Sequence, residues 1–397
     1  MKILYLHPAG AFGGASKSLI ELFSLLREAR VVGTVLTPAG SAANAFAKAG
    51  LSIETVRGLS QFDNTRYGHY RKLRWLIVLR ELFLLPFSLL ALWRLRRKTF
   101  DLIHLNEVTL LPLGILAKWL LRVPLVVHVR SLQRKPGAGL RSRWVNRLLR
   151  RHADAVVPID HTVSATLAQD LPLNIIHNGL KIADLPEQVP VGDGEVVKVG
   201  FLGVLIPLKG IFELLEAMRI LKARGARIRC LVAGENARQL SGFKAWLLGR
   251  FGFARDVRAE LEAFIQREAL EDRVQLLGFV GDVREVYPQL DILCFPSHLD
   301  AAGRPVFEAA FYSIPSVVAV QNPMPDAILH GVTGLAVPEP DPVLIADALQ
   351  KLAEDMVLRR RLGQQARVWA EQTFSIEVNA ERMLDLYRRV LSPSKGH

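Results

Sequence analysis

Short apolar runs alternate with segments of helical periodicity along almost the whole chain. In the first half, the predicted strands are 2–7, 31–37, 52–57, 101–106, 124–129, 155–159 and 174–177. In the second half, they are 197–204, 228–233, 274–279, 291–295, 316–320 and 334–337. Apolar residues at helical spacing fill intervening segments such as 15–29 and 210–224. Strands that are apolar throughout are buried on both faces, so the pattern predicts an α/β fold with parallel sheets covered by helices.

This alternation runs twice, and a segment rich in proline, glycine and acidic residues separates the two runs at 185–194. Such a composition is typical of a linker. We predict an N-terminal domain over 1–184, a linker over 185–196 and a second domain over 197–375. The tail, 376–397, carries a last helix that could return to the first domain. Two doubly wound domains would meet at a cleft facing the carboxyl ends of their strands, where such folds bind ligands.

Composition narrows the class of protein. Half of the 397 residues are hydrophobic and 22% are charged, which excludes an intrinsically disordered chain. Two cysteines, Cys230 and Cys294, are too few for a disulfide framework or a four-cysteine zinc module. The apolar run at the start is too short for a signal peptide, so we expect a cytoplasmic protein.

The formal net charge of +13 is distributed unevenly. Residues 1–190 hold 26 lysines and arginines against 12 acids, whereas residues 191–397 hold 25 against 26. A one-sided basic surface favours an anionic partner, which could be nucleic acid, an anionic bilayer or an acidic substrate.

The basic residues gather in two stretches that are also rich in leucine and tryptophan. Residues 66–98 hold nine basic side chains and one acid, and tryptophans stand at the ends of their apolar run. Residues 134–151 hold seven basic side chains and no acid. Both patterns are typical of contact with an anionic bilayer. We therefore predict peripheral attachment to the inner face of the membrane. The residues predicted to face it are Trp75, Trp93, Arg141, Trp144 and Arg147.

Other interpretations of these stretches stay open. The run 75–93 is close in length to the ~20 residues of a transmembrane span, although Arg80, Glu81 and Pro86 fall inside it. A core helix with a basic solvent face would account for part of either stretch. Residues 243–253 are a weaker third candidate for membrane contact. Nucleic acid is not an expected partner, because the chain carries no helix-turn-helix, zinc-finger or RNA-recognition signature.

Two glycine-rich turns lead from a predicted strand into a helix. The first is His7–Ser16 and the second is Gly200–Gly210, with Lys209 just before the helix. Glycines let backbone N–H groups approach a phosphate closely, and the helix dipole favours its negative charge. Neither turn matches a dinucleotide fingerprint or a P-loop, so each alone is also compatible with a plain strand-to-helix turn.

A third constellation follows the strand that ends at 295. Its loop presents Asp300, Gly303 and Arg304, and Glu308 lies in the first turn of the next helix. Two carboxylates so placed can bind sugar hydroxyls, while the free N–H groups between them face a phosphate. The alternative is that Glu308 merely interacts with the helix dipole. Its apolar neighbours make an unpartnered carboxylate costly, so a ligand hydroxyl is a reasonable partner.

These motifs together resemble the retaining nucleotide-sugar glycosyltransferases of family 4, which have the two-Rossmann GT-B fold. The resemblance covers nearly the whole chain. Its matching segments are Gly13-Gly14-Ala15, Asn178-Gly179, Gly203 to Lys209-Gly210, Gly278, Pro296-Ser297, Asp300-x7-Glu308-Ala309, Ile314-Pro315, Gly331-x-Thr333-Gly334-Leu335 and Val337-Pro338.

The resemblance implies a role for each matching residue. Glu308 is similar to the residue that holds the nucleotide ribose, and Asp300 to the carboxylate that contacts the transferred sugar. Lys209 corresponds to a diphosphate clamp and Gly14 to the glycine that meets the pyrophosphate. His128 matches the first-domain histidine near the donor sugar. Three further residues, Gly203, Gly303 and Arg304, are assigned to the donor, and Arg130 and Asn106 to the acceptor side.

Two departures from the family pattern concern the donor. Aspartate stands at 300, where the family usually has glutamate, and Val204 stands where it commonly has arginine. Arg304 is a candidate replacement for that cation. If no other residue replaces the missing cation at 204 and the longer carboxylate at 300, we expect weaker binding of the donor.

The resemblance implies a membrane-peripheral retaining glycosyltransferase that uses a nucleotide-sugar donor and a lipid-linked or glycan acceptor. No Asp-x-Asp motif occurs, so we expect no metal and no other cofactor. The alternatives are a sugar-nucleotide epimerase of similar fold and a catalytically weak binding subunit of a glycan-assembly complex.

Overall fold

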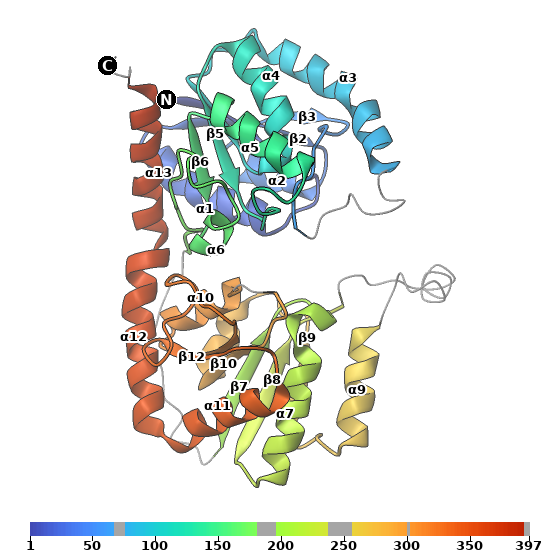
Figure 1. The fold of residues 1–397 in the computed structure, drawn as a ribbon, viewed down its shortest axis with the longest axis vertical. Helices are drawn as coiled ribbons and strands as arrows, with labels where there is room; N and C mark the ends of the chain where they lie inside the picture. The colour runs from blue at the N-terminus through green and yellow to red at the C-terminus, as the bar shows by residue number, and fades with distance from the viewer. Residues whose placement is uncertain (67–75, 181–195, 237–255, 300–301, 393–397) are drawn as a thin grey trace. The chain divides into compact units, whose positions relative to one another are not determined.

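The computed structural model describes residues 1–66, 76–180, 196–236, 256–299 and 302–392, and these form two compact units. The first unit comprises Met1–Lys181 and Thr373–His397, and the second comprises Ile182–Gln372 (Figure 1). Trp75, Asp300, the segment 243–253 and all but the last residue of the predicted linker lie outside the described residues.

The first unit is built on a six-stranded parallel sheet of order β3-β2-β1-β4-β5-β6. Its strands are β1 (Lys2–Leu6), β2 (Val32–Pro38), β3 (Ser52–Val56), β4 (Leu102–Leu105), β5 (Leu125–Val129) and β6 (Ala155–Pro158). Its helices are α1 (Gly14–Glu28), α2 (Ser41–Lys48), α3 (Ile77–Leu95), α4 (Leu111–Leu121), α5 (Leu140–His152), α6 (His161–Ser164) and α13 (Ile376–Leu391), with a 3-10 turn at Val108–Leu110.

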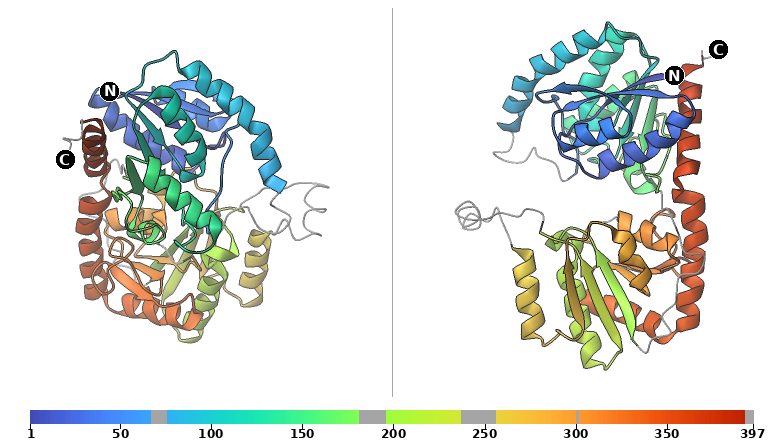
Figure 2. Two further views of the ribbon diagram at one scale, coloured as in Figure 1. Left: turned by 45° about the horizontal axis from the view of Figure 1, so that its top comes forward. Right: turned by 180° about the vertical axis from the view of Figure 1, so that it is seen from behind.

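Helices cover both faces of this sheet because successive side chains of each strand point to opposite sides. In β1, Leu4 and Leu6 pack into the cluster formed with α3, α4 and α5. Ile3 and Tyr5 pack on the other side, against α1 and α13. Figures 1 and 2 show α4 and α5 on one face and α1 on the other. The C-terminal helix α13 thus belongs to the first unit and contacts α1.

The second unit repeats this topology with the order β12-β11-β10-β7-β8-β9, again all parallel. Its strands are β7 (Val197–Leu202), β8 (Ile228–Ala233), β9 (Val274–Gly278), β10 (Ile292–Phe295), β11 (Ser316–Ala319) and β12 (Gly334–Val337). Its helices are α7 (Ile211–Ala223), α9 (Val257–Arg267), α10 (Arg304–Phe311), α11 (Pro342–Glu354) and α12 (Met356–Phe374). The last turn of α12 lies beyond Gln372, where the second unit ends. Short 3-10 turns form at Pro207–Lys209, Val283–Glu285 and Tyr287–Gln289.

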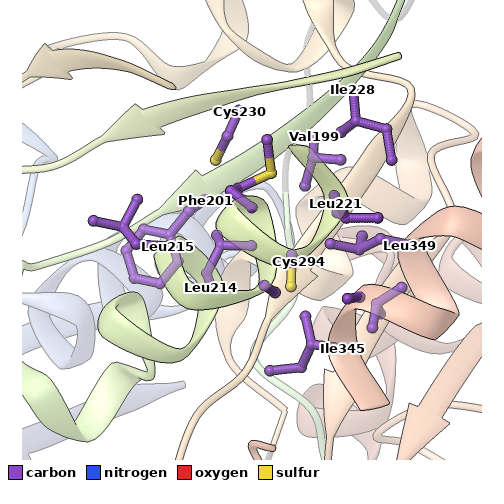
Figure 3. Close-up of a cluster of buried hydrophobic side chains, with 14 of the residues drawn as sticks. Val199, Phe201, Leu214, Leu215, Leu221, Ile228, Cys230, Cys294, Ile345 and Leu349 are labelled. Atoms are coloured by element: carbon purple, nitrogen blue, oxygen red, sulfur yellow. The ribbon is translucent and has the colours of Figure 1, made fainter. Parts of the chain in front are cut away.

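The second unit has two core clusters, and one of them lies between its sheet and the helices α7, α9 and α11. Val199 and Phe201 of β7 pack there against Leu214 of α7 and Leu349 of α11 (Figure 3). Both cysteines are buried as free thiols, and Figure 3 shows Cys230 and Cys294 within this cluster. Burial raises the pKa of the Cys230 thiol to about 12, so it stays protonated as part of the core.

The prediction of two doubly wound α/β domains is confirmed, but one predicted strand is wrong. Segment 174–177 forms no strand, although Asn174 and Ile176 donate backbone hydrogen bonds to Val156 and Pro158 of β6. Pro158 has no N–H to return a hydrogen bond, and the ladder therefore stops at this edge.

In each sheet the strand order reverses at one place, between β1 and β4 in the first unit and between β7 and β10 in the second. Chains leaving the two strands at such a point run to opposite faces of the sheet and open a crevice at the carboxyl ends of those strands. Ligands of doubly wound folds bind in this crevice. The two reversal points are therefore the places to look for functional side chains.

Candidate functional site

At the reversal point of the first unit, His7 follows β1 and Asn106 follows β4, and the two buried side chains meet. Asn106 Nδ2 lies 2.8 Å from His7 Nδ1 and donates to the Ala15 carbonyl over 3.1 Å. His7 Nε2 lies 3.1 Å from Ser16 Oγ in the first turn of α1. The predicted acceptor-side residue Asn106 is thus tied to the glycine turn that leads into α1.

Arg130, the first residue after β5, contacts Asn106, Asn178 and His128 and so connects this network. Its Nε and Nη2 donate to Asn106 Oδ1 over 3.1 and 2.9 Å, and its Nη1 donates to Asn178 Oδ1. Burial lowers the pKa of Arg130 only to about 10, so it stays charged at neutral pH. The structure brings the two residues predicted for the acceptor side, Arg130 and Asn106, into direct contact.

Because arginine can only donate, Arg130 fixes the directions of the bonds around it. Asn106 Oδ1 must accept, so its Nδ2 donates to His7 Nδ1 and the His7 proton lies on Nε2. Arg130 Nη2 also lies 3.4 Å from His128 Nδ1, which therefore accepts. A neutral His128 must then carry its proton on Nε2.

The chain of donors continues from His128 to the C-terminal helix. His104 Nε2 lies 3.2 Å from His128 Nδ1 and must donate to it, which leaves His104 Nδ1 to accept from the Tyr387 hydroxyl at 2.6 Å. His128 Nε2, the end of this chain, is buried and has no hydrogen-bond partner among the described residues. A buried donor without a partner is costly and suits a ligand oxygen.

All three histidines are neutral at physiological pH. Burial, followed by the charge of Arg130, lowers the pKa of His7 to about 4 and that of His104 to about 3. The same causes, with His104 added, hold the pKa of His128 well below its usual range. His128 can therefore donate a hydrogen bond from Nε2 without acting as a cation.

The N-terminus of α1 is open to a ligand. A Cβ added at Gly13 or Gly14 would meet no atom within 4 Å, so internal packing does not require glycine at either position. A bare backbone at a helix N-terminus lets an anion approach the free N–H groups. Gly14, predicted to meet a pyrophosphate, thus stands where such an approach is sterically open.

Glu107, next to Asn106, is a functional candidate that the sequence analysis missed. It lines a pocket of about 250 Å³ together with Pro8, Asp63, Arg80 and Glu81. Burial raises its pKa to about 7, against the lowering effect of a 2.9 Å hydrogen bond from the Val108 N–H. It is the second residue after β4, so a search of the residues that follow predicted strands could have found it.

At the reversal point of the second unit, the loops after β7 and β10 are tied together. A Cβ on Gly210, whose φ is +75°, would lie 1.7 Å from the Pro296 carbonyl oxygen. Ser297 Oγ and the His298 N–H both donate to the Leu208 carbonyl, over 3.2 and 3.0 Å. Gly210 is therefore a structural requirement of this junction.

The junction places Lys209 beside the end of β10, with Nζ 4.8 Å from the centre of the Phe295 ring. Burial lowers the pKa of Lys209, and a phosphate group would counteract this shift. Gly203, with φ of +147°, has open space where a Cβ would lie, and the neighbouring Val204 is exposed.

His298 pairs with Glu213 over 2.8 Å, and the second oxygen of Glu213 is buried with no partner in the part of the chain described.

Glu308 has protein partners on both carboxylate oxygens. Arg304 Nε donates to Oε1 and the Tyr287 hydroxyl donates to Oε2, each over 2.7 Å. Each oxygen has a second lone pair, so both can still accept from ligand hydroxyls. Burial, and then Glu308, holds the pKa of Tyr287 well above its usual range, so Tyr287 remains a donor. The pair Tyr287 and Arg304 orients Glu308.

Gly303, which precedes α10, has a packing role as well as its predicted place at the donor. A Cβ there would lie 2.3 Å from Cζ of Phe295. Arg304, the candidate replacement for the missing cation at Val204, is engaged with Glu308, which reduces its freedom to serve a phosphate. Asp300 lies outside the described residues.

Among the residues predicted to face a membrane, Trp93, Trp144 and Arg147 are exposed and Arg141 is partly buried. Trp93 stacks under Arg96, whose Cζ lies 4.3 Å from the ring centre. In the described residues, no helix combines the length and the apolar character that crossing a bilayer requires.

Two family models match the chain. A model described as glycosyl transferase 4-like domain matches residues 13–174, and one described as glycosyl transferases group 1 matches residues 188–369. Together they cover most of the two units.

Curated relatives and solved structures agree with these models. The chain is 25% identical over 198 residues to the capsular polysaccharide biosynthesis glycosyltransferase CapM of Staphylococcus aureus, which is 50% of this chain and 47% of that protein. It is 31% identical over 206 residues to a D-inositol 3-phosphate glycosyltransferase of Saccharomonospora viridis, 51% of this chain and 45% of the relative. The chain thus spans about half the length of the curated relatives it matches.

A solved structure of Anabaena HepE in complex with UDP and glucose matches with a TM-score of 0.72 at 22% identity, over 98% of this chain and 99% of that one. A glycosyltransferase from Rickettsia africae matches with a TM-score of 0.74 at 15% identity, over 99% of both chains. At these identities the likeness concerns the fold.

Proposed function

The chain belongs to the family 4 glycosyltransferases of the GT-B fold, and on that premise we propose that it transfers a sugar, with retention of anomeric configuration, from a nucleoside diphosphate sugar to a lipid-linked or glycan acceptor. The observation that carries the proposal is where the candidate residues lie. In the second unit they follow β7 and β10, which flank the reversal of strand order, and in the first unit they lie near the carboxyl ends of β1, β4 and the adjacent β5. Doubly wound sheets bind ligands at this edge.

The second unit supplies groups suited to the nucleotide. Glu308, held by Tyr287 and Arg304, offers lone pairs to the ribose hydroxyls. Lys209 and the N-terminus of α10 offer positive charge to the diphosphate. The departing nucleoside diphosphate gains negative charge in the transition state, and fixed donors that face this charge lower the barrier.

The first unit supplies groups suited to the sugar and the acceptor. The Nε2–H of His128 is a buried donor without a partner in the described chain, which suits a hydroxyl of the transferred sugar. Gly14 offers close backbone approach to the diphosphate. Arg130 and Asn106 orient these groups. In a same-face transfer the leaving phosphate takes the acceptor proton, so this scheme needs no separate base, and without an Asp-x-Asp motif we expect no metal.

Attachment to the cytoplasmic face of an anionic membrane is part of the proposal. The helices α3, α4 and α5 carry eight basic residues and one acid, and each exposes large apolar side chains. Basic side chains near an anionic leaflet contribute roughly 1 kcal/mol each. Co-sedimentation with anionic liposomes that weakens at high salt tests this part, and equal binding at high and low salt contradicts it.

The enzymatic proposal is tested in two steps. A thermal-shift screen with UDP, GDP, ADP and dTDP and their sugars identifies the donor, because a ligand that binds only the folded state raises Tm. The donor found is then incubated with candidate acceptors, and NMR of the product reads the anomeric configuration. An inverted product contradicts retention. Release of an epimerised sugar nucleotide without any acceptor supports the epimerase, and binding of no nucleotide supports the binding subunit.

A further inference from the structure

Helix α3 buries its acidic residue and its serine and exposes many of its apolar residues. Glu81 and Ser88, two turns apart, are buried and fasten the loop 58–61. Glu81 Oε2 accepts from the Gln61 N–H over 2.8 Å, and Ser88 Oγ accepts from the Ser60 N–H over 3.0 Å. Its exposed large side chains are six apolar residues, Leu79, Leu82, Phe83, Leu89, Leu90 and Trp93, and two arginines, Arg80 and Arg94. A helix with this orientation leaves an apolar face without a partner in the described chain.

The neighbouring helices continue this apolar face. α4 contacts both α3 and α5 and exposes Leu116, Trp119 and Leu120, while α5 exposes Leu140 and Trp144. Figures 1 and 2 show α3, in light blue, along one side of the first unit beside α4. The charges on these helices are almost all positive. Apolar exposure framed by positive charge is complementary to an anionic bilayer, where a lipid-anchored molecule is found.

A groove of about 280 Å³ opens between these three helices. Its walls are Leu82 and Leu85 from α3, Leu113 and Leu116 from α4, and Trp144 from α5. Phe62 closes one side, and its ring meets that of Trp144 edge-on with centres 4.8 Å apart. The groove is lined mostly by apolar side chains, which is the surface that an alkyl or isoprenoid chain buries best.

The groove adjoins the polar pocket that holds Glu107, because Gln61 and Glu81 line both. Two hydrogen bonds fix the Gln61 side chain at the border of the groove and the pocket. Thr109 Oγ1 donates to Gln61 Oε1 over 3.0 Å, and Gln61 Nε2 donates to the Pro8 carbonyl over 3.3 Å. Pro8 follows His7, so the polar pocket leads to the candidate site. The path therefore runs from the exposed apolar face, through the groove and the pocket, to the carboxyl end of β1.

We propose that this groove binds the apolar chain of a lipid-linked acceptor and that the polar pocket binds its hydroxyl-bearing head. The inference rests on the proposed function and selects the lipid-linked acceptor over a free glycan. Among the described lining residues of the pocket, the carboxylates Asp63, Glu81 and Glu107 face one guanidinium, Arg80. Carboxylates accept hydrogen bonds from sugar hydroxyls, whereas they repel a phosphate.

Alkyl glucosides test the groove on the 397-residue chain. Isothermal titration with methyl, butyl and octyl β-glucoside, each below its critical micelle concentration, measures dependence on chain length. Each methylene that enters the groove should raise affinity about fourfold, equivalent to about 0.8 kcal/mol. Affinity that does not depend on chain length overturns the proposal.

Matched variants locate the binding. Leu116→Trp fills the groove and should lower octyl glucoside affinity at least tenfold. Leu120→Trp, one turn later on α4 and similarly exposed but outside the groove lining, should change it less than twofold. A second pair, Leu82→Gln with Leu90→Gln as its control on α3, repeats the comparison without adding volume. Equal affinities within both pairs overturn the proposal.

Nucleotide binding separates this inference from the proposed function. None of the four variants touches the residues assigned to the donor, so each should keep the nucleoside diphosphate thermal shift of the wild type. Chain-length dependence in a protein that binds no nucleotide refutes the enzymatic proposal and leaves the groove assigned. Nucleotide binding without chain-length dependence refutes the groove alone.

Discussion

Replacing Tyr387 with phenylalanine tests the hydrogen-bond chain derived for the first unit. The hydroxyl donates to His104 Nδ1 over 2.6 Å, and both side chains are fully buried. The substitution keeps the ring and removes the donor, which leaves His104 Nδ1 buried and unsatisfied. Such an atom costs about 1–3 kcal/mol. For a unit of roughly 200 residues, each kcal/mol lowers Tm by about 2–4 °C.

The same variant separates the role of Tyr387 from that of Arg130. Because Arg130 still donates to His128 Nδ1, the His128 proton should stay on Nε2. Calorimetry measures the loss of stability, and ¹⁵N NMR of labelled histidines reports the tautomer. An unchanged Tm would show that the hydroxyl is not the donor to His104. A shift of the His128 proton to Nδ1 would show that Arg130 does not fix its tautomer.

Three further substitutions probe the two reversal points and the buried charges. Gly14→Ala should change Tm by less than about 2 °C, because the added Cβ meets no atom within 4 Å. Titration calorimetry should show at least a tenfold lower affinity for a nucleoside diphosphate, equivalent to about 1.4 kcal/mol. Unchanged affinity would contradict the role of Gly14 at the phosphate. Tyr287→Phe should cost about 1.5–3 kcal/mol in urea unfolding, because it removes a donor to a charged group. The wild type should lose stability as the pH falls below about 6.5, because the unfolded chain then protonates His7, His104 and His128 while the folded chain does not. Glu107, with its pKa raised to about 7, opposes this trend, so Glu107→Gln should steepen the loss by about 1.4 kcal/mol per pH unit between about pH 5 and 6.5.

Sequence reasoning located the residues that stand at strand ends. The segments that hold Lys209 and Glu308 stand out because each follows an apolar run that marks a strand, and parallel strands share one edge. The roles of His128 and Asn106 come from the family resemblance. The position of a residue relative to a predicted strand depends only on the sequence nearby, so local patterns can predict it.

The partners of these residues could not be assigned in the same way. Tyr387 reaches His104 across 283 positions, and Tyr287 reaches Glu308 from a 3-10 turn that leaves no periodic pattern. Nor did the sequence indicate which face of α3 is buried. Nearly all residues of that helix are apolar, so its periodicity is weak, and two polar side chains bonded to a loop determine its orientation.

In the proposed donor site, Glu308 binds the ribose of the nucleotide. The most direct test compares the nucleoside diphosphate that stabilises the protein most with its 2′-deoxy form, in the wild type and in Glu308→Gln, by titration calorimetry. A hydroxyl bound to a carboxylate contributes about 1.5–3 kcal/mol, so the wild type should prefer the ribose form at least tenfold. The variant should lose most of that preference. An equal preference in both proteins would place the ribose elsewhere and contradict the assignment.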